Sequence, residues 1–276
     1  MLTVAIEQGI ARLTLNRPQV GNAFNAELIA ELQQQFERLA DDDSVRVLVL
    51  AGEGKHFCAG ADLNWMKQQK DGSQQENQAD ALALAQMLKA LYEFPKPTIA
   101  MVQGAAFGGA LGLICACDMA VASSDARFCL SEVKLGLSPA TISPYVLAAM
   151  GPRQARRYWL TAELISAQQA QQLQLVHEVV AKDDLNDQVQ QWCQALLANG
   201  PQAMAATKHL IQQQGSELND ALLYSTSDLI ARLRVGDEGQ EGLTAFLQKR
   251  SPSWQVTPDK ESAPAEQPTP VEEHKA

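Results

Sequence analysis

Residues 45–63 read VRVLVLAGEGKHFCAGADL, and residues 98–112 read TIAMVQGAAFGGALG. Each segment begins with a largely apolar run, over residues 45–50 and 98–102, which predicts a buried β-strand. A turn rich in glycine and alanine follows each run and would lie at the carboxyl end of its strand. Open α/β sheets bind ligands at that edge, so these segments predict both the fold class and the position of a site.

The segments around these two strands alternate between strand and helix patterns. Two short apolar runs at the amino terminus predict a hairpin, since a Gln8-Gly9 turn separates them. Apolar residues at spacings of three and four predict helices elsewhere. The predicted strands are 2–6, 10–15, 45–50, 98–102 and 119–122, and the predicted helices are 26–40, 80–93 and 109–117. Buried strands that alternate with helices predict a parallel sheet in a layered α/β core.

The carboxy-terminal third is predicted to be mainly helical. Its predicted helices are 144–160, 167–173, 184–198, 201–214 and 218–233, with one short strand at 176–180. After Trp254 the chain has hardly an apolar residue, so it cannot bury enough surface to offset its ordering entropy. We therefore divide the chain into an α/β core at 1–195, a helical region at 196–254 and a disordered tail at 255–276.

The composition indicates a soluble globular protein. Of its 276 residues, 46% are hydrophobic, but no stretch approaches the roughly 20 apolar residues of a membrane span. The amino terminus does not resemble a signal peptide, so we expect a cytoplasmic protein. The net charge of −10 argues against binding to nucleic acid or to a membrane surface. Five cysteines, an odd number in mostly apolar segments, favour buried reduced thiols over disulfides or a metal site.

Backbone amides in the two turns could converge on one ligand atom, because small residues let the main chain come close. The second turn also precedes the predicted helix at 109–117, whose first amides have no partner within the helix. Those amides would stabilise a developing oxyanion. Tight backbone packing alone is one alternative. Binding of a dinucleotide phosphate is another, but the G-x-G-x-x-G spacing is absent.

Residues 57–63 (FCAGADL) and 104–109 (GAAFGG) resemble the two signature segments of the crotonase superfamily of enoyl-CoA hydratases and isomerases. The resemblance extends over roughly residues 2–254, with supporting matches at 15–18, 22–25, 97–100, 117–118, 128–136 and 245–250. It implies an α/β fold of the ClpP/crotonase type. In that fold a spiral of ββα units forms a layered sheet core, and a helical carboxy-terminal region mediates trimerisation.

The resemblance also implies roles for individual residues. The amides of Ala61 and Gly109 would form an oxyanion hole for the thioester oxygen of an acyl-CoA substrate. Phe246 and Lys249 match positions that reach the ligand of a neighbouring subunit, which implies a homotrimer or a hexamer of two trimers. Coenzyme A enters as part of the substrate, and no other cofactor or metal is implied. The residues that match CoA-binding positions are Asn22, Ala23, Lys55, Phe57, Ala59, Asp62 and Leu63.

Hydratases of this superfamily generally use two glutamates, and this chain departs from that pattern. The second glutamate matches Glu132, whereas Gly112 stands where the first one normally lies. One carboxylate could still activate water for attack on an enoyl thioester, or it could shuttle a proton in an enoyl-CoA isomerase. For either role we expect apolar neighbours to raise the pKa of Glu132.

A closer resemblance, to bacterial methylglutaconyl-CoA hydratases, favours hydration. It rests on residues 57–66 (FCAGADLNWM) and 131–145 (SEVKLGLSPATISPY). The implied substrate is branched and carries a distal carboxylate, which requires a donor or a cation in the acyl pocket. Candidates are Lys134, Ser143 and Tyr145, although a lysine at a loop edge often faces solvent.

The remaining predicted residues of the acyl pocket are Trp65, Met66 and Gly112. An aromatic residue and a methionine at the start of a helix are more often plain packing residues. His56 is assigned to the surface or to a phosphate rather than to catalysis. A third hypothesis is a non-catalytic protein that uses an enzyme fold to bind RNA or acyl-CoA, although the acidic charge and the retained Ala61, Gly109 and Glu132 argue against it.

Overall fold

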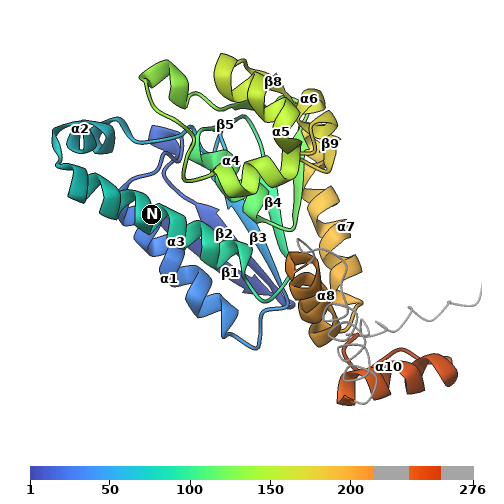
Figure 1. Ribbon diagram of the computed structural model, residues 1–276. Coiled ribbons are helices and arrows are strands. Elements are labelled where there is room, and N and C mark those ends of the chain that lie inside the picture. The colour runs from blue at the N-terminus through green and yellow to red at the C-terminus, as the bar shows by residue number, and fades with distance from the viewer. Residues whose placement is uncertain (214–235, 256–276) are drawn as a thin grey trace, which may run out of the picture.

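The computed structural model describes residues 1–213 and 236–255 (Figure 1). The helix predicted at 218–233 and nearly all of the tail predicted at 255–276 lie outside the described residues. Within those residues, no helix is long and apolar enough to cross a membrane.

A mixed β-sheet forms the centre of the described chain. Its strands run in the order β1-β2-β3-β4-β6-β9. β1 and β2 pair as an antiparallel hairpin, and every other neighbouring pair in this sheet is parallel. This confirms the predicted parallel sheet with a hairpin at the amino terminus. The strands are β1 (Leu2–Glu7), β2 (Ile10–Leu15), β3 (Val47–Gly52), β4 (Thr98–Val102), β6 (Met119–Ser123) and β9 (Glu178–Val180).

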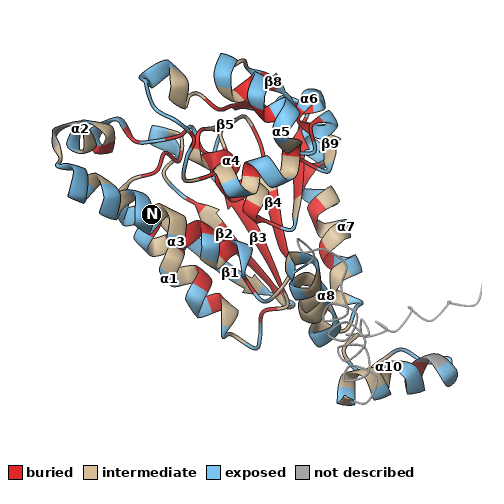
Figure 2. Ribbon diagram, in the orientation of Figure 1, coloured by how far each residue is buried: buried red, intermediate tan, exposed pale blue. Residues whose placement is uncertain are grey.

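The two faces of this sheet carry separate apolar clusters. Along β3 the side chains alternate, so Leu48 and Leu50 enter one cluster and Val47 and Val49 the other. All four are fully buried, as the colouring of the strands in Figure 2 shows. One face is covered by α1 (Ala26–Ala40) and α3 (Gln74–Tyr92), which pack on each other, and the other by α7 (Leu185–Leu197).

A second, small sheet holds short strands that the sequence did not predict. β5 (Ala105–Phe107) pairs in parallel with β7 (Arg127–Cys129), which pairs antiparallel with β8 (Ile165–Ser166). The second glycine-rich segment is therefore strand as well as turn. β5 leads directly into α4 (Gly109–Ala116), so the end of this small sheet sets the start of the helix.

The remaining elements complete the upper and carboxy-terminal parts of the molecule (Figure 1). The helix predicted at 80–93 begins earlier, at Gln74, because Ser73 and Glu76 form a capping box there. The boundary predicted between residues 195 and 196 falls inside the last turn of α7. The other elements are η1 (Pro18–Val20), α2 (Leu63–Asp71), η2 (Glu132–Leu135), α5 (Ser143–Thr161), α6 (Ala167–Gln172), η3 (Lys182–Asp184), α8 (Pro201–Gln213) and α10 (Asp237–Leu247).

Polar contacts attach the carboxy-terminal helices to the core and to each other. The Nζ of Lys208 in α8 lies 2.8 Å from the carboxylate of Asp118, which also accepts from the amide of Thr98 at 2.8 Å. Glu238 of α10 accepts hydrogen bonds from the amides of Gln202 and Ala203, at 2.9 and 2.8 Å, in the first turn of α8. Beyond that contact α10 extends away from the sheet (Figure 1).

Candidate active site

The two glycine-rich segments lie side by side at the carboxyl ends of β3 and β4. The amide of Phe57 donates to the carbonyl of Gln103 at 2.8 Å, and the amide of Cys58 donates to Ala105 at 3.1 Å. Phe107 in turn donates to Cys58 at 3.0 Å. Residues some 45 positions apart in the sequence are thus joined by backbone hydrogen bonds, as their common position at the sheet edge predicted.

The amide of Ala61 is left available by the pairing around it. Phe24 donates to the carbonyl of Gly60 and accepts from the amide of Asp62, each at 2.8 Å. This parallel bridge uses the polar groups on either side of Ala61, so the N–H of Ala61 points away from Phe24. Ala61 itself is exposed at the surface. Its amide can therefore donate to a ligand.

The amide of Gly109 is available for a different reason. Gly109 is the first residue of α4, and the amide before it, on Gly108, donates to Cys129 at 2.9 Å. The first amides of a helix have no acceptor within the helix. Gly108 has φ of +54° and carries no side chain that could cap the helix. The N–H of Gly109 is thus a second free donor at the positive end of a helix dipole.

Glu132 places its carboxyl beside this donor. In η2, its Oε1 lies 3.3 Å from the position that a Cβ would take at Gly108, the residue before Gly109. Its Oε2 is buried and, within the described residues, has no hydrogen-bond partner. Burial raises the pKa of Glu132 from its ordinary value. A carboxyl with a free buried oxygen and a raised pKa is suited to proton transfer.

Gly112 lies one helical turn beyond Gly108 and leaves no room for a second carboxylate. A Cβ at this position would lie 2.6 Å from Cγ2 of Ile142 and 3.1 Å from Cδ1 of Leu88. Ile142, just before α5, is almost fully buried. The space that a side chain at position 112 would need is therefore filled by apolar atoms.

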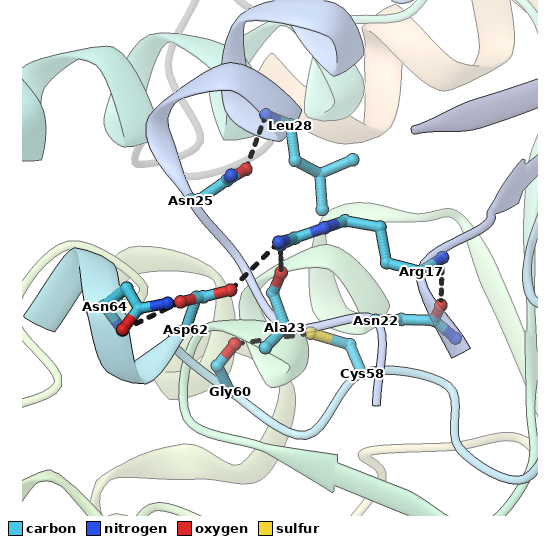
Figure 3. A network of polar contacts seen from close by, with 9 residues as sticks. All are labelled: Arg17, Asn22, Ala23, Asn25, Leu28, Cys58, Gly60, Asp62 and Asn64. Atoms are coloured by element: carbon cyan, nitrogen blue, oxygen red, sulfur yellow. Dashed lines mark hydrogen bonds and ion pairs between the residues drawn. The ribbon is translucent and has the colours of Figure 1, made fainter. Parts of the chain in front are cut away.

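An ion pair holds the first loop in shape (Figure 3). Arg17 Nη2 lies 2.9 Å from Asp62 Oδ2, and Arg17 Nη1 donates to the carbonyl of Ala23 at 2.5 Å. Asp62 also caps α2 by accepting from the amide of Asn64 at 2.8 Å. This amide and Arg17 lower the pKa of Asp62. The residue after Ala61 is thereby fixed to the loop that follows β2.

The family model described as Enoyl-CoA hydratase/isomerase matches residues 5–257. The chain belongs to the enoyl-CoA hydratase/isomerase family. It is 36% identical over 254 residues to 2,3-dehydroadipyl-CoA hydratase of Escherichia coli K12, covering 92% of this chain and 98% of that relative. The match extends over both glycine-rich segments and Glu132.

Solved structures agree with this assignment. An enoyl-CoA hydratase from Shewanella pealeana is 50% identical with a TM-score of 0.89, and the match covers 92% of this chain and 95% of that one. Pseudomonas aeruginosa AtuE is 38% identical, also with a TM-score of 0.89, over 92% and 98% of the two chains. The predicted crotonase fold and superfamily membership are confirmed.

The residues predicted to bind CoA fall into two groups in this enoyl-CoA hydratase/isomerase family member. Lys55, Ala59 and Leu63 are exposed beside Ala61, where a ligand can reach them. The others are buried: Asn22, Ala23, Phe57 and Asp62. The polar side chains of Asn22 and Asp62 make hydrogen bonds within the protein.

The side chain of Asn22 makes all its hydrogen bonds to the backbone of the protein itself. It is fully buried, with a left-handed φ of +57°, and its amide nitrogen donates to the carbonyls of Glu53 and His56 at 2.9 and 2.8 Å. Its side-chain oxygen accepts from the amide of Arg17 at 2.8 Å. Asn22 therefore stabilises the conformation of the loop after β3.

The predicted acyl-pocket residues do not all gather around Glu132. Met66 is half-buried, and Trp65 is 8% exposed and borders a cavity of about 370 Å³ next to α1 and α3. Tyr145 packs against Tyr92, with ring centroids 5.4 Å apart, and lines a different cavity of about 650 Å³ that Glu132 does not line.

The two remaining candidates for the distal carboxylate differ in availability. The hydroxyl of Ser143 donates to the carbonyl of Ala140 at 2.6 Å. Lys134 is exposed on η2, two residues after Glu132, and is the freer of the two. Lys249 is exposed after the end of α10, which also contains Phe246, whose side chain lies outside the description.

Sequence reasoning missed the roles of Arg17 and Ile142. Arg17 lies in the LNRP segment that supported the resemblance, so its position was marked but its partner was not. The five cysteines are free, and four of them are buried, as the apolar segments around them predicted. Burial raises the pKa of Cys58 to about 12, so this thiol beside the site is not a nucleophile. Within the described residues, no cluster of three metal-ligating side chains occurs.

Proposed function

We propose that this protein is a hydratase that adds water across the α,β double bond of a branched enoyl-CoA, with 3-methylglutaconyl-CoA as substrate and 3-hydroxy-3-methylglutaryl-CoA as product. The observation that carries this proposal is the carboxyl of Glu132, 3.3 Å from the Cβ position of Gly108, with one buried oxygen free. Gly108 is the residue before Gly109, whose amide is one of the two proposed donors.

The reaction follows from these three groups. The thioester oxygen accepts hydrogen bonds from the amides of Ala61 and Gly109, which draws electron density from the double bond. Glu132 takes a proton from water as the water oxygen bonds to the β-carbon, and an enolate forms on the thioester. The protonated Glu132 then gives its proton to the α-carbon, so one water is added in total. A single carboxyl performs both transfers.

Two considerations support a branched substrate with a distal carboxylate. The segments 57–66 and 131–145 resemble those of methylglutaconyl-CoA hydratases, which supports both the branch and the distal carboxylate. A relative at 36% identity bears the name 2,3-dehydroadipyl-CoA hydratase, which supports a distal carboxylate but not a branch. Lys134, on the same short helix as Glu132, supplies an exposed cation that can pair with such a carboxylate.

Isomerisation of a 3-enoyl-CoA to a 2-enoyl-CoA is the second candidate. It is favoured by one observation, the apolar filling of position 112 by Ile142, which leaves a single carboxylate. An isomerase needs one group that removes a proton from the α-carbon and returns it to the γ-carbon. Hydration and isomerisation thus share the oxyanion hole and Glu132 but differ in whether water reaches the β-carbon.

Turnover of three substrates by the purified protein tests the proposal. 3-Methylglutaconyl-CoA, crotonyl-CoA and a 3-enoyl-CoA are compared at equal concentration, with Glu132→Gln as the control. The proposal expects hydration of the branched substrate to be fastest and to be lost in the Gln variant. Isomerisation without hydration would favour the second candidate, and RNA binding without turnover would favour neither.

The subunit arrangement is also a proposal. We infer a homotrimer, or a hexamer of two trimers, in which Phe246 and Lys249 contact the ligand of a neighbouring subunit. The support is the position of α10, which extends away from the sheet of its own chain, with Leu247 78% exposed (Figure 1).

A further inference from the structure

The ladder between the two glycine-rich segments contains an interruption at His56. Cys58 and Ala106 form a parallel bridge, in which Cys58 donates to Ala105 and accepts from Phe107. Continued regularly, this ladder would give the amide of Ala105 the carbonyl of residue 56. That carbonyl accepts instead from the side chain of Asn22 at 2.8 Å.

The imidazole of His56, instead of its backbone carbonyl, is the acceptor for the amide of Ala105. Its Nδ1 accepts a hydrogen bond from the amide of Ala105 at 3.0 Å. The two segments also approach closely here, since a Cβ at Gly104 would lie 2.9 Å from this Nδ1. Both backbone polar groups of Ala105 are thus bound by the loop after β3, one by Cys58 and one by the ring of His56.

The position of this contact relates it to the oxyanion hole. His56 precedes Ala61 by five residues, and Ala105 precedes Gly109 by four. The Cβ position of Gly21 lies 3.8 Å from Cδ2 of His56, so the ring also borders the loop that follows β2. A change in the distance between residues 56 and 105 would therefore shift one donor of the hole relative to the other.

We propose that His56 is a positioning residue, which fixes the distance between the two donors of the oxyanion hole by accepting the amide of Ala105 through its imidazole. This inference rests on the proposed oxyanion hole at Ala61 and Gly109. His56 does not touch the reacting atoms and exchanges no proton with them.

The role requires one form of the ring. Nδ1 can accept only when it carries no proton, so the neutral imidazole holds its proton on Nε2. Burial, together with the neighbouring charge of Lys55, lowers the pKa of His56 and so favours this neutral form. An asparagine at this position can present its side-chain oxygen where Nδ1 lies, whereas a leucine of similar size cannot accept a hydrogen bond.

The chain offers a matched control at His177. Its Nδ1 accepts from the amide of Ala120 at 3.1 Å, and its own amide donates to the carbonyl of Ala120 at 2.8 Å. This histidine joins the segment before β9 to β6 and lies outside the proposed site. His177→Leu removes the same kind of hydrogen bond without touching either glycine-rich segment.

The test compares four proteins: wild type, His56→Leu, His56→Asn and His177→Leu. We expect kcat of His56→Leu to fall about tenfold or more with KM changed less than about twofold, since small displacements of groups that position a transition state are costly in rate. His56→Asn should recover most of this loss, and His177→Leu should keep the wild-type kcat. Equal kcat in wild type and His56→Leu, or equal losses in the Leu and Asn variants, would overturn the inference.

A second measurement needs no turnover and distinguishes the role of His56 from the existence of the oxyanion hole itself. The infrared carbonyl band of ¹³C-labelled butyryl-CoA shifts to lower frequency when an oxyanion hole polarises the bound thioester. We expect this shift in wild type and His177→Leu and a smaller one in His56→Leu. A normal shift in all three would overturn the role of His56 alone. No shift in wild type would overturn the proposed oxyanion hole and the inference with it.

Discussion

Glu132 is half-buried, with Oε2 fully buried, in surroundings that disfavour the charge it needs as a base. Its folded-state pKa lies above its ordinary value of 4.5, and burial is the cause. A group of this kind contributes to folding in its neutral form. That contribution is complete below about pH 4.5 and is lost as the pH rises through the folded-state pKa. The same raised pKa moves the acidic limb of the pH profile of kcat/KM to higher pH.

The raised pKa of Glu132 predicts how the stability of Glu132→Gln changes with pH. Glutamine is neutral at every pH, so the variant should be no more stable than wild type at about pH 5 and should become increasingly more stable towards about pH 8. Thermal unfolding of both proteins across this range measures the difference. A difference that stays constant with pH would show that the carboxyl is not buried as described.

Gly112 gives a prediction about packing. A methyl group there would lie 2.6 Å from Cγ2 of Ile142, so Gly112→Ala should reduce the free energy of unfolding by about 1–3 kcal/mol. Removing Cγ2 in an Ile142→Ala background should make Gly112→Ala less costly than it is in the wild-type background, and denaturant unfolding of the double-mutant cycle measures the coupling. Additive effects would contradict the contact.

At the scale of residues, Ala61, Gly109 and Glu132 could be proposed from the sequence because they lie within motifs that can be read along the chain, and their catalytic roles stay a prediction. The sequence did not locate Ile142 or His56. Their roles depend on neighbours thirty or more positions away, Gly112 for Ile142 and Ala105 for His56. It also assigned Asn22 and Asp62 to the ligand, while their side chains are largely engaged with the protein.

The attachment of α8 to the sheet gives a prediction at the scale of elements. Lys208 is 11% exposed where it meets Asp118, so Lys208→Met should cost about 1–3 kcal/mol by leaving a charge-assisted hydrogen bond unmade. The exposed pair of Lys89 and Glu93 is the control, and Lys89→Met should cost less than about 0.5 kcal/mol. Hydrogen exchange in α8 should rise only in the first variant; equal exchange would contradict the attachment.

Elements with a clear period were predicted well, and short ones were missed for physical reasons. Helix α1 matches the predicted range of 26–40, because its buried residues repeat at spacings of three and four and Asn25 caps it. β5 and β8 have three and two residues, too few to show any alternation. Helix α2 is mostly polar, LNWMKQQKD, so its apolar pattern is weak, and Asp62 starts it as a cap.

At the scale of the whole molecule, the exposed leucines of α10 predict that the chain forms an oligomer. Leu243 and Leu247 are 51% and 78% exposed in the single chain, although they lie on a helix with Ala245 buried. We expect light scattering to give three or six times the mass of one chain. Leu247→Glu should shift this value towards the monomer and raise KM, since Phe246 and Lys249 would lose their partner. A wild-type monomer with full activity would contradict the proposed assembly.

The most direct test of the account is the rate at which Glu132→Gln hydrates 3-methylglutaconyl-CoA, compared with wild type at saturating substrate. We predict a loss of about a thousandfold or more in kcat, because Glu132 is proposed to make both proton transfers. Binding of CoA should be retained. Hydration at a comparable rate in the Gln variant would contradict the central claim and assign the chemistry to another group.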